Sequence, residues 1–164
     1  MDNVKQFIVI YRERLKDMHI QECYSSIEKQ NRCRLYRNIK PNYKMESYLL
    51  NNYNKELMQC LTKIRLCSHK LLVERGRWQR PKLEYRDRLC TMCEERDIED
   101  EYHVLMKCTY FSIIRKKYLR SYYSHRPSMF KFQKSLTTDN KRDLFRLMLY
   151  IKIVLKMYNS GLTQ

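Results

Sequence analysis

Three cysteines and one histidine are grouped in a short stretch of the chain, and their spacing is the strongest constraint on its fold. The stretch CTMCEERDIEDEYHVLMKC runs from Cys90 to Cys108 and contains Cys93 and His103. A Cys-x-x-Cys pair suits a tight turn, and a closed set of three sulfurs and one nitrogen is what structural Zn²⁺ prefers. We therefore predict that Cys90, Cys93, His103 and Cys108 hold one structural zinc ion, with no open position for catalysis.

The alternative is that these four residues are ordinary buried thiols and a core histidine.

On an ideal α-helix His103 and Cys108 would lie about 140° apart, so we expect the helix to end near Lys107 and Cys108 to lie in the following turn. Thr109 is then expected to cap the next helix. The remaining cysteines stand singly, and we expect them to be small buried hydrophobic residues: Cys23, Cys33, Cys60 and Cys67.

Six acidic residues lie between the two cysteine positions of this stretch, although the chain has a formal net charge of +16. They are Glu94, Glu95, Asp97, Glu99, Asp100 and Glu101. Carboxylates are repelled by thiolate ligands, so we expect these side chains to face Lys and Arg residues of the surrounding body instead. Their expected role is to orient the knuckle and balance charge.

The scarcity of glycine and proline favours helices over a turn-rich sheet architecture. The chain has two glycines and three prolines in 164 residues, and 43% of its residues are hydrophobic. We predict a mainly α fold, a helical domain with a small CCHC zinc knuckle between helices. We divide it into an N-terminal helical segment with a basic connector (1–56), a zinc-binding core (57–125) and a C-terminal helical segment (126–164).

Apolar periodicity predicts where the helices lie. The expected helices are a long one over Val4 to Ile27, with the charged stretch RERLKD on its solvent side, and further ones over 45–53, 57–66, 109–123, 127–136 and 141–158. Between the first two lies a basic connector, Lys29 to Lys44, which Pro41 breaks. Gly76 is expected either to adopt a positive φ or to allow a close approach that a Cβ would block.

No stretch of the sequence is typical of a secretory signal or a membrane span. The N-terminal apolar run FIVIY is short and is followed at once by charged residues. The run from Leu147 to Tyr158 contains Lys152 and Lys156 and is shorter than the roughly 20 residues that a span needs. We expect an intracellular protein, in the nucleus or cytoplasm, that is not secreted and does not bind membranes.

The excess of basic residues favours a polyanion as partner. Thirty-four Lys and Arg stand against eighteen Asp and Glu, which points to nucleic acid. Arg115, Lys116, Lys117 and Arg120 recur within two helical turns among aromatic residues, a mixture suited to phosphate pairing and base stacking. The alternative is a solvated helix face with the aromatics buried beneath it.

Arg77 and Trp78, beside Gly76, form a second candidate contact with nucleic acid. They could clamp a strand by stacking and phosphate contact. Alternatively, Trp78 packs over the zinc knuckle while Arg77 pairs with Glu74. His69 is expected to be a core or helix-end histidine and not a ligand.

The order of these residues resembles the zinc-binding C-terminal region of non-LTR retrotransposon (LINE-type) reverse transcriptases. The stretches that carry the resemblance are LTKIRLCSHKLLVERGRWQRP and RLCTMCEERDIEDEYHVLMKCTYFSIIRKKY. The matched positions are Arg65, His69, Val73, Glu74, Gly76, Arg77, Trp78, Arg88, Cys90, Cys93, Glu99, Asp100, Glu101, His103, Cys108, Tyr110 and Arg115. The likeness covers most of the chain and weakens past about Tyr123. It implies a zinc-stabilised module that holds template RNA or target DNA, near a polymerase supplied by a reverse transcriptase polypeptide.

The sequence departs from that family where catalysis is concerned. A two-metal polymerase needs paired aspartates, and the chain contains no Asp-Asp pair. Beyond Glu101 its only acids are Asp139 and Asp143, too few for a nuclease centre of that kind. We therefore expect no enzyme. The alternatives to a nucleic-acid-binding module are a structural or protein-interaction module that docks onto a reverse transcriptase, and a vestigial transposon fragment.

Overall fold

Helices form nearly all of the regular structure, which confirms the predicted mainly α fold. The computed structural model of the chain describes residues 2–30, 33–40 and 44–161. The helices are α1 (Asp2–Lys29), α2 (Arg34–Ile39), α3 (Ser47–Leu50), α4 (Lys55–Arg65), α5 (Leu72–Arg75), η2 (Tyr85–Asp87), η3 (His103–Lys107), η4 (Thr109–Phe111), α6 (Ser112–Tyr118), α7 (Ser121–Ser124), α8 (Met129–Leu136) and α9 (Lys141–Gly161). Within the described ranges the one strand-like pairing is an antiparallel bridge between Leu89 and Ile98.

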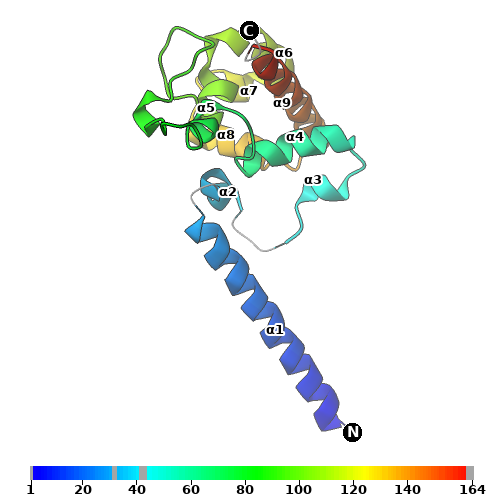
Figure 1. Cartoon of the computed structure of the whole chain (residues 1–164). Helices are drawn as coiled ribbons and strands as arrows, with labels where there is room; N and C mark the ends of the chain where they lie inside the picture. The colour runs from blue at the N-terminus through cyan, green and yellow to red at the C-terminus, as the bar shows by residue number, and fades with distance from the viewer. Residues whose placement is uncertain (1, 31–32, 41–43, 162–164) are drawn as a thin grey trace.

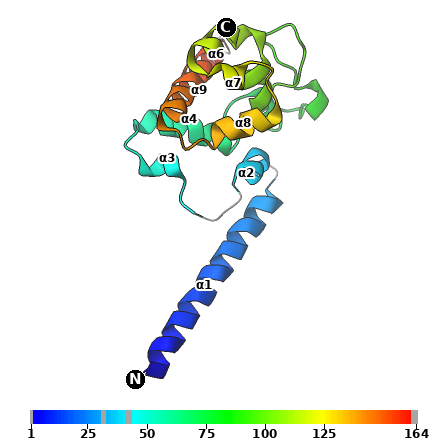
Figure 2. The ribbon, with the colours of Figure 1, turned by 180° about the vertical axis from the view of Figure 1, so that it is seen from behind.

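The body of the protein is built around α9, which packs against α4, α6 and α8 (Figures 1 and 2). On α4 the apolar residues Leu57, Leu61 and Ile64 recur at helical spacing, so one face of this helix is buried. Ile151 and Val154 of α9 are equally inaccessible to solvent. The helix pair α4–α9 therefore forms the centre of the core.

The segment 57–125, which contains the cysteine–histidine cluster, and the C-terminal segment 126–164 share this core. The buried Tyr150 hydroxyl of α9 donates a hydrogen bond of 2.9 Å to the carbonyl of Leu105, in the turn that carries the histidine. Arg146, also on α9, donates to the Lys117 carbonyl at 2.8 Å. Helix α9 thus holds the histidine turn and the end of α6 through hydrogen bonds, although it lies far from both in the sequence.

Helix α1 stands apart from this body. It confirms the long helix expected over Val4 to Ile27, and it projects away from the other helices in both views (Figures 1 and 2). Its apolar side chains are in solvent: Phe7 is 67% exposed, Met18 57% and Leu15 46%. The apolar stripe on this helix is therefore left without a partner from the described part of the chain.

The other expected helices are present with changed bounds: α4 and α9 are slightly longer than predicted, and α8 is shorter. The helix expected over 45–53 is reduced to α3, and the one expected over 109–123 is divided into η4, α6 and α7. The predicted break at Pro41 lies outside the described residues. None of the described helices is long and apolar enough to cross a membrane.

Candidate metal centre

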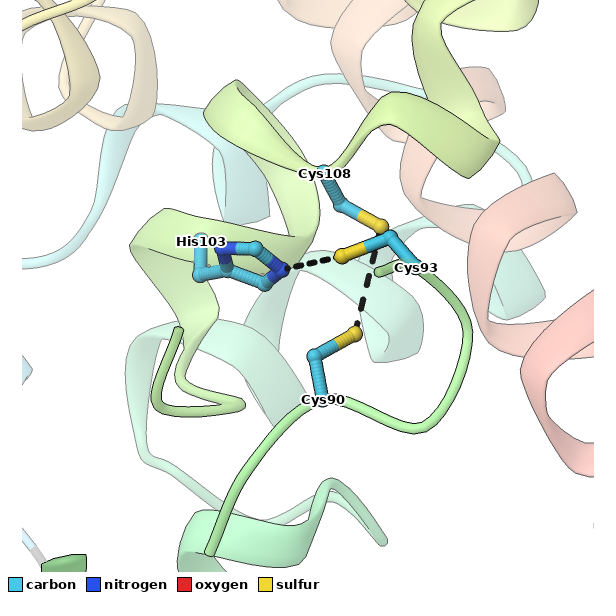
Figure 3. Close-up of side chains that lie close together, drawn as sticks. All are labelled: Cys90, Cys93, His103 and Cys108. Atoms are coloured by element: carbon cyan, nitrogen blue, oxygen red, sulfur yellow. Dashed lines mark hydrogen bonds between the residues drawn. The ribbon is translucent and has the colours of Figure 1, made fainter. Parts of the chain in front are cut away.

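The four predicted ligands meet in one place. Cys93 Sγ lies 3.3 Å from His103 Nε2, and Cys90 Sγ lies 4.0 Å from Cys108 Sγ (Figure 3). One ligand atom from each residue lies within 4.8 Å of all the others. Cys90, His103 and Cys108 are buried, and Cys93 is half-buried. This cluster could hold a metal ion in a closed, four-coordinate site.

A short loop presents the first two cysteines. Leu89 and Ile98 pair across its base, and the Cys90 amide donates to the Asp97 carbonyl at 2.9 Å. The loop reverses through Arg96, whose φ of 52° lies in the left-handed region. This closure directs both sulfurs inward toward the histidine, as the close-up shows (Figure 3).

A wide helical turn brings His103 and Cys108 together. Residues His103–Lys107 form a π-helical turn, and the Cys108 amide donates to the His103 carbonyl at 2.7 Å. This bond spans five residues, so the two side chains converge where an α-helix would hold them apart. The helix ends at Lys107 as predicted. The prediction for Thr109 is wrong, because it begins a 3₁₀ turn and its side chain caps neither this turn nor α6.

The sulfurs of Cys90 and Cys108 face each other in a hydrogen-bonding contact. Their hydrogen-bonding contact, aided by burial, raises the pKa of the Cys90 thiol to about 12. The same contact lowers the pKa of Cys108 below its ordinary value. A bound dication would replace that proton, since a coordinating thiol is deprotonated. A cation between the two sulfurs would therefore take the place of the hydrogen bond that joins them.

The second ring nitrogen of His103 faces a carboxylate. His103 Nδ1 lies 3.5 Å from Asp97 Oδ2, and Lys107 Nζ holds the same oxygen at 2.8 Å. The Nδ1 atom is buried, and its contact with Asp97 does not have hydrogen-bond geometry. Burial alone would lower the pKa of His103, but the contacts with Cys90 and Asp97 raise it above its ordinary value. Asp97 is placed to orient the ring, as carboxylates beside metal-bound histidines do.

A buried carboxylate ties the knuckle to α2. Glu101 is 3% exposed and accepts from Arg34 Nη2 at 3.0 Å and from His69 Nε2 at 2.9 Å. Burial alone would raise the pKa of Glu101, but His69, Cys67 and Arg34 together hold it at about 2. Ligand atoms of Cys67, His69 and Glu101 also lie within 4.8 Å of one another. The side chain of His69 is inaccessible to solvent, as expected of a core histidine.

The acidic residues of the stretch make two kinds of contact, with basic side chains and with backbone amide or hydroxyl donors. Asp97 and Glu101 face basic side chains, as predicted. Glu99 instead accepts from the Leu72 amide at 2.6 Å and from the Tyr158 hydroxyl, while Asp100 accepts from the His103 amide at 2.8 Å. Carboxylates that bind backbone N–H groups fix the path of the chain. These acids therefore shape the ligand loop as well as balance its charge.

Gly76 lies where the backbone and Arg88 leave no space. A Cβ on Gly76 would lie 2.8 Å from the Leu72 carbonyl oxygen and 3.0 Å from Arg88 Nε. These distances confirm the predicted close approach. The alternative prediction of a positive φ is wrong, because the φ of Gly76 is −62°. The buried Arg88 side chain donates to the carbonyls of Val73 and Leu83. Arg88 thereby joins the turn to the strand-like segment that precedes Cys90.

Arg77 and Trp78 have different surroundings. Arg77 pairs with Glu74 at 3.4 Å, as in the structural alternative. Trp78 is 76% exposed, so the prediction that it packs over the knuckle is wrong. Its ring is available to stack on a partner.

The basic residues of α6 do not form one exposed face. Arg115 is only 8% exposed and donates to the Cys108 and Lys107 carbonyls at 3.0 and 3.2 Å. The prediction that Arg115 meets phosphates is therefore wrong, because its guanidinium closes the end of the ligand turn. Arg120 Nε pairs with Asp143 at 2.8 Å, whereas Lys116 and Lys117 are exposed. Sequence spacing missed this role of Arg115, which depends on carbonyls freed by the π-helical turn.

Most of the residues that carry the family resemblance contact one another or the same backbone turn. The contacts are Arg88 with Gly76 and Val73, Glu74 with Arg77, Glu101 with His69, Asp100 with His103, and Arg115 with Cys108. Comparison with protein-family models, curated proteins and solved structures gives no match for the chain.

Proposed function

We propose that the chain is a zinc-stabilised nucleic-acid-binding module of a retrotransposon-type reverse transcriptase. It holds template RNA or target DNA and has no catalytic centre of its own. The metal cluster supplies a rigid scaffold, and the positive surface supplies the affinity. A reverse transcriptase polypeptide is the second partner in this proposal.

Zinc suits the cluster better than other common ions. In a tetrahedral site with ordinary Zn–S and Zn–N bonds, two sulfurs lie about 3.8 Å apart and a sulfur and a nitrogen about 3.6 Å apart. The distances of 4.0 Å between Cys90 and Cys108 and 3.3 Å between Cys93 and His103 are close to these values. Three thiolates and an imidazole also favour zinc over the hard cations, which take oxygen ligands.

The observation that carries the nucleic-acid proposal is how charges divide between the interior and the surface. Among the described residues three basic side chains are buried (Arg65, Arg88 and Arg115), against four acidic ones (Glu74, Glu99, Glu101 and Asp143). Burial therefore removes slightly more negative than positive charge from the surface. The formal excess of +16 is left in solvent, where it attracts phosphates at long range.

The order of the motif residues supports the link to reverse transcriptases. Many of these residues contact one another or the backbone near the ligands, as described above. A sequence likeness is more informative when the matched residues share a structural task than when they are scattered. Under this proposal the missing aspartate pair means that catalysis belongs to another polypeptide.

Fluorescence anisotropy with labelled strands of RNA and DNA, single and double, tests the proposal. We expect binding that weakens linearly in a plot of log affinity against log salt concentration, because lysines and arginines displace counterions from phosphates. Incubation with Mg²⁺ or Mn²⁺ should leave the strands neither extended nor cut. Failure to bind any strand at low salt would contradict the proposal.

Helix α1 favours a second candidate function, a protein-interaction module. Its exposed apolar side chains, Phe7, Ile8, Tyr11, Leu15 and Met18, are suited to packing against a partner helix. In this candidate the helix docks onto the reverse transcriptase. Co-purification with that polypeptide tests this candidate. Docking is favoured if replacing Leu15 and Met18 with Ser abolishes co-purification while replacing Lys116 and Lys117 with Ala leaves it intact.

A further inference from the structure

A groove of about 660 Å³ lies between α4, the loop after it, and α9. Four lysines line it, Lys63, Lys70, Lys152 and Lys156, and its one acidic residue is Glu56. Lys152 Nζ already binds the Glu56 carboxylate at 2.6 Å. The other three lysines therefore give the groove a local excess of positive charge.

These three lysines are not engaged inside the protein. Within the described residues no ion pair involves Lys63, Lys70 or Lys156, and all three are exposed. Lys152 and Lys156 lie four residues apart on α9, a spacing at which like charges repel each other. Glu56 already offsets the charge of Lys152, so Lys63, Lys70 and Lys156 are the lysines left to meet an anion in the groove.

The metal-centre scaffold fixes the position of the loop lysine. Lys70 follows His69, whose side chain is inaccessible to solvent and is held by Glu101 of the knuckle. The loop is held further by the Ser68 amide, which donates to the Lys63 carbonyl at 2.7 Å, and by the Leu71 amide, which donates to His69 Nδ1 at 3.3 Å. The backbone at Lys70 is therefore held in place beside the groove before a ligand arrives.

We infer that this groove binds the sugar-phosphate backbone of a nucleic-acid strand through Lys63, Lys70 and Lys156. No Phe, Tyr or Trp side chain is among the residues that line it, and the ring of His69, which does, is inaccessible to solvent. The groove therefore reads phosphates and does not stack bases. The inference rests on the proposed function and gives it a location different from the α6 face. It predicts contacts that do not depend on base sequence.

Two matched variants test the inference. K70A/K156A removes two groove lysines, and K116A/K117A removes two exposed lysines of α6, so both lower the net charge equally. Binding to a labelled single strand of mixed sequence is measured across a salt series, with zinc content and helical circular dichroism as controls for folding. For single strands each lost phosphate contact flattens the log–log salt slope by about 0.7.

We expect K70A/K156A to flatten the slope by about 1.4 and K116A/K117A to leave it nearly unchanged. The loss should be the same for strands of different sequence. If both variants weaken binding equally, or if only K116A/K117A does so, the groove inference is wrong while the proposed function stands. If the wild-type protein binds no strand, the proposed function fails and the groove inference fails with it.

Discussion

The knuckle and α1 are both rich in charged residues, yet their charges have different surroundings. Around the ligands, Arg88, Glu101 and Arg115 are buried and bind carbonyls or opposite charges. On α1, which projects away from the other helices (Figure 1), charged side chains and large apolar ones such as Phe7 and Met18 lie in solvent. Charge in the knuckle therefore serves the fold, whereas the charged side chains of α1 lie in solvent. Counting charged residues in the sequence does not separate these two uses.

Removal of the metal should have the largest effect and should be confined to the knuckle. Structural zinc contributes on the order of 10 kcal/mol of apparent binding energy in small fingers, so a strong chelator should unfold this lobe. Hydrogen exchange would show lost protection at residues 88–108. Amide hydrogens of the exposed helix α1 are expected to exchange fast, and their exchange rates should be the same with and without the chelator. Unchanged exchange in 88–108 under chelation would contradict a structural metal.

Leucine-to-alanine changes compare the core with α1 directly. Leu61 on α4 is inaccessible to solvent, so Leu61→Ala should lower the free energy of unfolding by about 2–5 kcal/mol. Leu15 on α1 is 46% exposed, and Leu15→Ala should change it by less than about 0.5 kcal/mol. Denaturant unfolding in the presence of zinc measures both. A comparable loss from the α1 change would mean that α1 packs on the body in solution.

Arg115 and Lys116 on α6 allow the same comparison between a buried and an exposed side chain. Arg115→Ala leaves the Cys108 and Lys107 carbonyls without their donor and should cost about 1.5–3 kcal/mol, the usual range for charged hydrogen bonds. Lys116→Ala, on the exposed side of α6, should cost no more than about 0.5 kcal/mol. Thermal unfolding of the two variants provides the measurement. Equal stability would remove the structural role assigned to Arg115.

Much of the fold could be predicted from local pattern. Helical periodicity gave the positions of α1, α4 and α9, and ligand spacing gave the four residues of the metal cluster. The close approach at Gly76 was also predictable, because glycine is scarce in this chain. These features depend on residues that are near one another in the sequence.

The remaining features depend on contacts between distant segments. Arg34 pairs with Glu101, 67 residues away, and no local pattern indicates this partner. The basic groove joins Lys63 and Lys70 to Lys156 of α9, so it exists only once α4 and α9 pack together. The burial of Arg115 follows from a π-helical turn, which ordinary helical spacing does not predict. Charged residues were therefore the hardest to place from sequence alone.

The metal content of the gently purified protein tests the central claim most directly. Native mass spectrometry should find one zinc ion per chain in the wild type and in Cys23→Ser, whose cysteine lies on α1 away from the cluster. Cys93→Ser should lose that ion or hold it much more weakly, because it removes one of four ligands. A wild-type protein without stoichiometric metal, or a Cys93→Ser variant that binds zinc as tightly as wild type, would contradict the account.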